Sequence, residues 1–180
     1  MVIKRISILF FIFCYLIGCK QKSAKAPFAK IIYHTSECYG WCPVYHLEVD
    51  SNKILKLYSE MAHRNAIDNS GDSTKIGYFT GKIADTTFTK LQNAVTTLGI
   101  DTVKFRNITC CDGALKTIII YHDGKRKFLR SMFPPKAANN LISLLQGICE
   151  QNNLQRASSK FNIESGDTVK VSDVRYPPKQ

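Results

Sequence analysis

The sequence lacks the motifs that mark the common classes of enzyme. Its 180 residues contain no Gly-x-Ser-x-Gly elbow, no His-Glu-x-x-His pair and no glycine-rich loop that cradles phosphate. Its longest apolar run, Ile6–Ile17, has twelve residues with Ser7 inside it, fewer than the roughly 20 that span a bilayer as a helix. We therefore expect no catalytic residues, no metal, no cofactor and no membrane-spanning helix.

The N-terminal segment has the pattern of a secretory signal. Lys4 and Arg5 give it a basic start, and the apolar run follows. The run ends in Leu16-Ile17-Gly18-Cys19, which resembles the bacterial lipobox, where the cysteine is lipidated and becomes the first residue of the mature chain. The resemblance implies a lipoprotein signal peptide at 1–18, and a lipidated Cys19 with a tether at 19–28. The alternative is an ordinary signal peptide cut elsewhere, with Cys19 incidental.

Lipid on Cys19 would make this an anchored protein. Two or more acyl chains, such as palmitate, hold a protein stably at about 0.8 kcal/mol per buried methylene. We expect a location in the bacterial cell envelope, first of all at the outer membrane, with the domain in the periplasm or at the cell surface.

Acidic residues are scarce. The chain has 14 Asp and Glu against 25 Lys and Arg, a formal net charge of +11. A basic surface attracts nucleic acid, anionic lipid headgroups or acidic partners, although a solvated basic face is the plainer interpretation. Export argues against nucleic acid. The partners to expect are the membrane, through lipid on Cys19, and an envelope protein or acidic ligand.

Seven cysteines are present, and five remain if Cys14 leaves with the signal and Cys19 takes lipid. Outside the cytoplasm, paired cysteines form disulfides by default, and an odd count leaves one unpaired. Cys149 is the candidate, because it follows the apolar face of an expected helix and can act there as a small apolar residue. The pairing of Cys110 and Cys111 stays open: a bond between neighbours is strained, and either could reach another cysteine.

The pattern along the chain predicts an α+β fold, an antiparallel β-sheet with two helices packed on one face. Expected helices run from Asp85, as a cap, to Gly99 and from Pro134-Pro135 to about Asn152-Asn153. Asp123-Gly124 is a hairpin signal. The domain is expected at 29–154, followed by a polar basic tail at 155–180. Expected strands are 30–36, 43–50, 53–58, 76–83, 103–109, 116–121, 125–132 and a short one at 168–171, with a loop at 61–74.

The first two strands predict their own register. If they form a hairpin around Gly40, residues whose numbers sum to 80 face each other, so that Cys38 meets Cys42 and His34 meets His46. Facing Cβ atoms lie about 4.5–5.5 Å apart, slightly beyond the spacing of a disulfide, so a small adjustment of the loop is needed. We predict a structural Cys38–Cys42 disulfide.

Three other sites compete with this interpretation. His34, Cys38, Cys42 and His46 are ligand types that zinc or copper accepts, but on strands His34 and Cys38 would be about 13 Å apart. Cys-x3-Cys-Pro also resembles the motif of the Sco-type copper chaperones, where a helix follows; here a strand pattern follows. A thiol-redox or copper- and zinc-handling role is therefore the alternative function. A hydrolase using the acidic and histidine residues Asp112, His122 and Asp123 is a weaker idea, since Asp123 suits the turn.

Three segments and a hairpin together resemble a known family. The segments are Ile32-Tyr33-His34-Thr35, then Cys38-Tyr39-Gly40-Trp41-Cys42-Pro43-Val44-Tyr45 followed by a strand pair, and Gly77-Tyr78-Phe79-Thr80-Gly81-Lys82-Ile83 before the first helix. The Asp123-Gly124 hairpin precedes the second helix. The pattern, which covers roughly 29–152, is similar to a bacterial lipoprotein family known as domain of unknown function 6438. The resemblance implies an exported, often lipid-anchored α+β domain and supplies no catalytic residues. We therefore expect a non-enzymatic binding or interaction module, for which Tyr39 and Trp41 at the hairpin tip could form a contact surface or fold onto the sheet.

Overall fold

The structure, a computed structural model, describes residues 26–39, 42–61, 72–110 and 112–164. Its strands form one antiparallel sheet in the order β6-β5-β1-β2-β3-β4-β7, and the predicted α+β class is confirmed. None of the helices in these ranges has the length and apolar character needed to span a bilayer. The strands are β1 (Lys30–Thr35), β2 (Val44–Asp50), β3 (Ile54–Met61), β4 (Gly77–Lys82), β5 (Lys116–His122), β6 (Lys125–Ser131) and β7 (Gln155–Arg156); the helices are η1 (Ser73–Lys75), α2 (Asp85–Leu98), η2 (Lys136–Ala138) and α3 (Asn139–Cys149).

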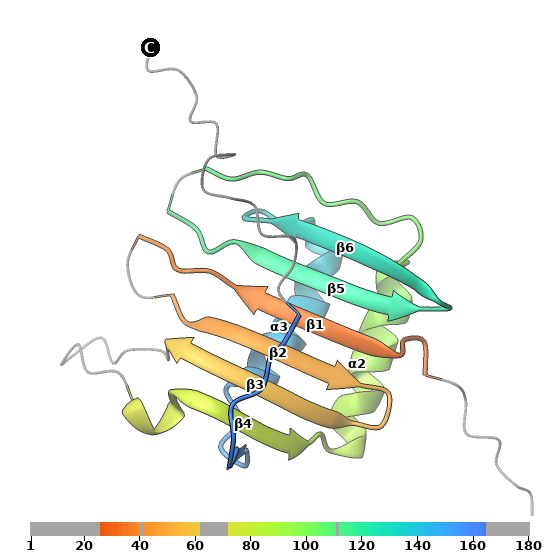
Figure 1. Cartoon of the computed structure of the whole chain (residues 1–180). Coiled ribbons are helices and arrows are strands. Elements are labelled where there is room, and N and C mark those ends of the chain that lie inside the picture. The colour runs from red at the N-terminus through yellow and green to blue at the C-terminus, as the bar shows by residue number, and fades with distance from the viewer. Residues whose placement is uncertain (1–25, 40–41, 62–71, 111, 165–180) are drawn as a thin grey trace, which may run out of the picture.

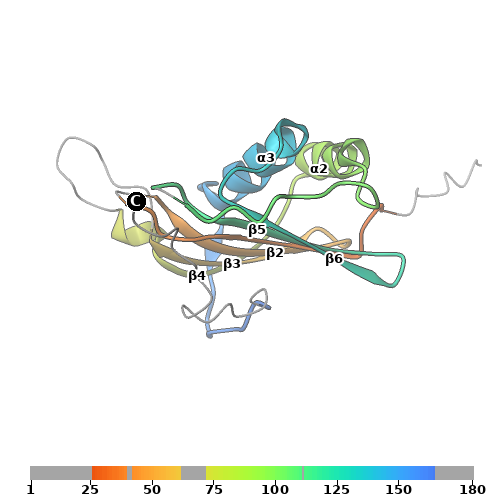
Figure 2. The same cartoon turned by 90° about the horizontal axis from the view of Figure 1, so that it is seen from above.

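Both α-helices cover the same face of the sheet (Figures 1 and 2). The core forms between them because alternate strand residues point to that face. Ile31 and Tyr33 of β1 belong to one buried cluster with Leu91 of α2 and Leu145 of α3, whereas Ile32 between them does not. The opposite face of the sheet carries no helix in the described residues, and we call it the open face.

The predicted hairpin register is confirmed. Strands β1 and β2 pair Ile31 with Val49 and His34 with His46, so that paired numbers sum to 80. Asp123 and Gly124 both have positive φ, 45° and 73°, as a tight hairpin turn of this type requires. Gly99 ends α2 in the left-handed conformation, as expected.

Several expected boundaries and one expected strand were wrong. Helix α2 has Ala84 at its N-cap instead of Asp85, whose carboxylate accepts a hydrogen bond from Lys53 at 2.8 Å. Helix α3 begins at Asn139, after the 3-10 helix η2 that follows Pro134-Pro135, and ends at Cys149, so it is shorter than predicted at both ends. Residues 103–109 are not a strand: Val103 and Phe105 pack against the core, but this segment joins no ladder and runs beside β6, where Met132 N donates to Ile108 O at 3.0 Å. The short strand expected at 168–171 lies outside the described residues.

The chain beyond residue 154 takes part in the sheet. Strand β7 pairs with β4, and Ala157 N then donates to Tyr78 O at 2.8 Å. Residues 157–164 cross the open face toward β1 (Figure 1); we call residues 155–164 the strap. Sequence analysis treated them as part of a polar tail and left their role open. The strap is the described segment that lies on this face (Figure 2).

Gly77 makes room for the start of the strap. Its φ is +123°, and a Cβ there would lie 2.7 Å from Nη1 of Arg156, which donates to Ile76 O at 3.0 Å. We expect Gly77→Ala to lower the free energy of unfolding by about 1–3 kcal/mol, through backbone strain and displacement of Arg156. Urea unfolding measures it. Gly147→Ala is the control: with no atom within 4 Å of its Cβ, it should stabilise α3 by about 0.5–1 kcal/mol. Equal changes in the free energy of unfolding for Gly77→Ala and Gly147→Ala would contradict the close contact between Gly77 and Arg156.

Tyr33 carries an unsatisfied hydroxyl. The side chain is fully buried, and its Oη has no hydrogen-bond partner among the described residues; burial raises the pKa of Tyr33 well above its ordinary value. Since an unpaired buried hydroxyl costs more than it contributes, Tyr33→Phe should raise the free energy of unfolding by about 1 kcal/mol. Tyr121→Phe is the matched control, and it should destabilise because Tyr121 donates to Glu164 at 2.6 Å. The same sign for both variants in thermal unfolding would refute this account.

Candidate functional site

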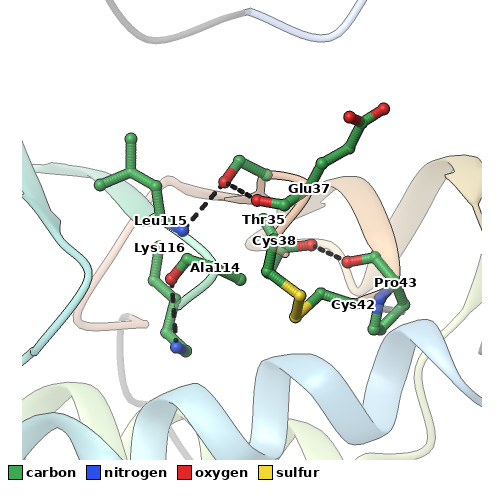
Figure 3. The surroundings of a disulfide bond; sticks show 9 residues. Thr35, Glu37, Cys38, Cys42, Pro43, Ala114, Leu115 and Lys116 are labelled. Atoms are coloured by element: carbon green, nitrogen blue, oxygen red, sulfur yellow. Dashed lines mark hydrogen bonds between the residues drawn. A yellow bond between two sulfur atoms is a disulfide. The ribbon is translucent and has the colours of Figure 1, made fainter. Parts of the chain in front are cut away.

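A disulfide closes the loop between β1 and β2. Cys38 and Cys42 are bonded, with their Cα atoms 5.5 Å apart (Figure 3). Thr35 fixes the C-terminal side of the loop: its hydroxyl donates to Pro43 O at 2.8 Å and accepts from Tyr45 N at 2.9 Å. On this side the loop is therefore supported by a covalent bond and by the Thr35 hydroxyl.

The other side of the loop is held by Leu115, the residue just before β5. Ser36 N donates to Leu115 O at 3.0 Å, and Leu115 N donates back to the Ser36 hydroxyl at 2.9 Å. Tyr39 is 90% exposed, so of the two alternatives considered for this side chain, folding onto the sheet is wrong. Trp41 lies outside the described residues. The loop thus presents the ring of Tyr39 to solvent, next to a backbone that is held on both sides.

The remaining cysteines do not join this bond. Cys149 is a free, buried thiol, as predicted, and burial raises its pKa well above the ordinary value. It therefore stays protonated and is a poor nucleophile. Cys110 forms no bond with Cys38, Cys42 or Cys149, and its amide donates to Sδ of Met132 at 3.0 Å. Cys111 lies outside the described residues.

The two histidines of the considered metal set bind each other. Nε2 of His34 donates to the carbonyl oxygen of Glu164 at 2.7 Å, and its Nδ1 lies 2.9 Å from Nδ1 of His46. A carbonyl only accepts, so a neutral His34 accepts at Nδ1 and His46 donates. The cysteines are consumed in the disulfide, and the described residues hold no group of three or more metal-ligating side chains.

Asp112, His122 and Asp123, which were considered for a hydrolase, do not form a catalytic site in the structure. His122 is buried, and its Nε2 lies 3.8 Å from the carboxylate of Asp101. Asp123 has a φ of 45° in the β5–β6 turn, where it was expected. Asp112 is exposed in the segment before β5. Nothing in this group resembles a nucleophile with an oriented base.

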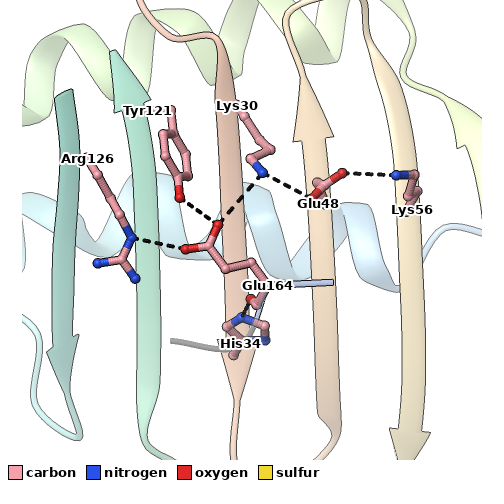
Figure 4. A network of polar contacts seen from close by, with 7 residues as sticks. All are labelled: Lys30, His34, Glu48, Lys56, Tyr121, Arg126 and Glu164. Carbon is pink, nitrogen blue, oxygen red and sulfur yellow. Dashed lines mark hydrogen bonds and ion pairs between the residues drawn. The ribbon is translucent and has the colours of Figure 1, made fainter. Parts of the chain in front are cut away.

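A cluster on the open face holds one carboxylate. Tyr121 Oη donates to Oε2 of Glu164 at 2.6 Å, Arg126 Nε donates to Oε1 at 3.0 Å, and Lys30 Nζ lies 3.8 Å from Oε2 (Figure 4). Partial burial raises the pKa of Glu164, but these hydrogen bonds and the positive charges outweigh it, so the pKa lies below its ordinary value. We call Lys30, His34, Tyr121 and Arg126 the cradle.

Neighbouring contacts extend the cradle across the face. Lys30 also lies 3.5 Å from Glu48, which pairs with Lys56 at 3.3 Å (Figure 4). A row of aromatic side chains lies beside these charged residues on the open face. His46 stacks on Tyr58, Tyr58 on Tyr78, and the ring edge of Phe161 from the strap meets Tyr78 with centroids 5.2 Å apart.

Sequence reasoning missed the strap. His34 and His46 were placed together correctly, but Glu164 was not considered, because its partners lie up to 130 residues away in the chain. One signal was present: Phe161 and Ile163 alternate with polar residues just before Glu164. Both are partly buried, which is typical of an extended segment lying on a surface.

Acidification should loosen the strap. Burial, the largest cause, lowers the pKa of His34 to about 4 from 6.5; the hydrogen bond to Glu164 opposes this shift, and His46 adds to it. A detached strap lets His34 regain its ordinary pKa, so the detached state binds more protons and the strap is lost as pH falls from about 6.5 toward 4. Glu164 acts in the same direction at lower pH, since its contribution disappears as pH falls through its depressed pKa.

The size of this effect should be roughly 1–2 kcal/mol between pH 7 and pH 5, after discounting for partial exposure. The protection factor of the Ala157 amide measures it. The control is His34→Gln, whose amide can still donate to the carbonyl of Glu164 but does not titrate. If His34→Gln loosens equally between these pH values, His34 is not the group responsible.

The fold and the braced hairpin define an α+β domain with an antiparallel sheet, helices on one face and a disulfide-closed loop. The chain belongs to the family described as Domain of unknown function (DUF6438), which matches residues 29–150. The resemblance in sequence is thereby confirmed for the domain, and the match covers about two thirds of the chain. No curated protein matches the sequence. The cradle lies within the matched residues, whereas Glu164 lies beyond them.

Proposed function

We propose that this is an exported, lipid-anchored protein of the bacterial cell envelope that acts as a non-enzymatic binding module. The observation that carries the proposal is the Cys38–Cys42 disulfide, because such bonds form and persist outside the cytoplasm. The lipobox-like segment ending in Cys19 supports the anchor. The exposed ring of Tyr39 on a braced loop supports binding, since aromatic side chains are enriched in interfaces.

Two measurements on cells that express the full chain test the location. The first is incorporation of radiolabelled palmitate, which we expect in the native chain and not in Cys19→Ala. The second is membrane fractionation, in which Cys19→Ala should move from the membrane to the soluble fraction. Equal labelling of both chains would overturn the anchor. The matched control is Cys14→Ala, which removes a cysteine from the expected signal peptide and should leave labelling unchanged.

The alternative, thiol-redox or metal handling by Cys38 and Cys42, makes the opposite prediction about the bond. A structural disulfide should resist mild reductant, whereas a redox pair opens near the potential of its compartment. Alkylation of residues 20–180 after graded reduction, followed by a peptide map, separates the two. A bond that opens at mild potential, with a lowered thiol pKa at either cysteine, would favour the alternative.

A further inference from the structure

We propose that the open face of the sheet is a binding site for an extended acidic peptide of a partner protein, and that the strap occupies this site in cis. The inference rests on the proposed function as a binding module and names the partner class. Its four supports are the rigid cradle, an apolar floor beside it, the position of the occupant outside the family domain, and the chemistry of that occupant.

The strand ladder holds the backbone of the cradle in place. Lys30 of β1 pairs with Tyr121 of β5, and Tyr121 pairs with Arg126 of β6. The three donors therefore form one row across three adjacent strands, and the ladder fixes their spacing. Two cations and a phenol that converge on one point suit a carboxylate, since hydrogen bonds to ionised groups are about twice as strong as neutral ones.

An apolar floor lies beside this row. Ile32 and Ile119 are register partners on β1 and β5, and both are fully buried. They alternate with the core residues Ile31 and Tyr33, so they face away from the helices. Among the described residues, the strap is what covers this face (Figure 2). Ile32 and Ile119 therefore lie on the same face as the cationic cluster of the cradle, and apolar side chains beside cationic ones are the composition of a peptide-binding surface.

The occupant is separable from the domain. The family match ends at residue 150 and contains all of the cradle, whereas Glu164 comes later in the chain. Among the described residues, the ladder between β7 and β4 has two residue pairs, Phe79 with Arg156 and Thr80 with Gln155, and the hydrogen bonds of Arg156 and Ala157 add to it. A segment tethered this way binds at an effective concentration in the millimolar range, so even weak contacts keep it in place until a better ligand competes.

The strap defines the chemistry of its competitor. Phe161 packs its edge on Tyr78, Ile163 is partly buried, and Glu164 offers its carboxylate to Arg126 and Tyr121 and its carbonyl to His34. The ligand that fits is therefore an extended peptide with an aromatic residue, one intervening residue, an apolar residue and then glutamate. The basic composition of the chain favours such an acidic partner.

Cutting the strap after folding tests the proposal. A protease recognition sequence is inserted between Ser158 and Ser159 of residues 20–180, and the folded protein is cleaved. We expect the released fragment to dissociate on dilution while the remaining sheet keeps its circular dichroism and its cooperative thermal transition. A fluorescent peptide of residues 159–168 should then bind the cut protein at least about tenfold more tightly than the uncut one, because the cis strap no longer competes.

Two matched substitutions identify the contacts. The peptide with Glu164→Gln, and the cut protein with Arg126→Gln, should each bind at least about tenfold more weakly, as expected for loss of a hydrogen bond to a charged group. Lys125→Gln removes the same charge from the same strand at an exposed position outside the cradle, and it should leave binding unchanged.

Several results would overturn the inference. The first is unfolding of the sheet once the fragment leaves, which would make the strap a structural element. The second is no binding of the peptide at 1 mM, about the effective concentration in cis. The third is equal binding of the native peptide and the Glu164→Gln peptide. If the insertion prevents folding, Glu164→Gln in the uninterrupted chain should still increase exchange of the Ala157 amide and admit the peptide. This assay uses soluble protein that lacks Cys19. A negative result would therefore overturn the peptide site without bearing on lipidation at Cys19.

Discussion

Leu145→Ala is expected to lower the free energy of unfolding by about 3 kcal/mol. Leu145 is fully buried in the middle of α3, within the cluster that joins both helices to the sheet. Truncation of a buried leucine loses its transfer free energy and leaves a cavity, and such changes cost about 2–5 kcal/mol. Urea unfolding of residues 20–180, followed by tryptophan fluorescence and circular dichroism, measures the difference.

Ser143→Ala is the matched control for this prediction. Ser143 lies on the same helix but is exposed, so its substitution should change the free energy of unfolding by less than about 0.5 kcal/mol. A loss below about 1 kcal/mol for Leu145→Ala would mean that α3 is loosely packed on the sheet. The helix would then be a poor foundation for the rows of side chains on the opposite face.

Most of the sheet could be predicted because its signals are local. The β1–β2 register followed from alternation about Gly40, and the Asp123-Gly124 turn followed from residues that tolerate positive φ. Residues 103–109 show the limit of the same signal. Val103 and Phe105 alternate as in a strand and do pack inward, but alternation reports burial on one side and says nothing about a ladder partner.

The sequence predicted only the part of the candidate site that lies within the β1–β2 hairpin. The Cys38–Cys42 and His34–His46 pairs follow from a single register. The cradle combines three strands with a strap whose hydrogen bonds to it span 38 to 130 residues. No local period encodes such a contact. The strap also has few apolar residues, so composition alone marks it as a tail.

The double variant Cys38→Ala/Cys42→Ala is expected to lower the free energy of unfolding by about 2 kcal/mol. The bond links residues only four apart, and the loop-entropy relation gives this value for so short a loop. Thermal and urea unfolding measure it, and the native protein treated with reductant should show the same loss. Cys149→Ala is the control: it truncates a buried side chain, and its stability should remain sensitive to reductant because the disulfide is still present.

The place where the protein loses stability without the disulfide distinguishes a structural bond from a functional one. If the disulfide supports the hairpin, its removal should increase hydrogen exchange first at Tyr45, whose amide donates to the Thr35 hydroxyl, and at Leu115, whose amide donates to Ser36. Exchange at the centre of β1 should change only as much as global stability does. A loss below about 0.5 kcal/mol would mean that Thr35 and Ser36 hold the loop without the bond. The cysteines would then have a use other than stability, and thiol-redox or metal handling would become the leading function.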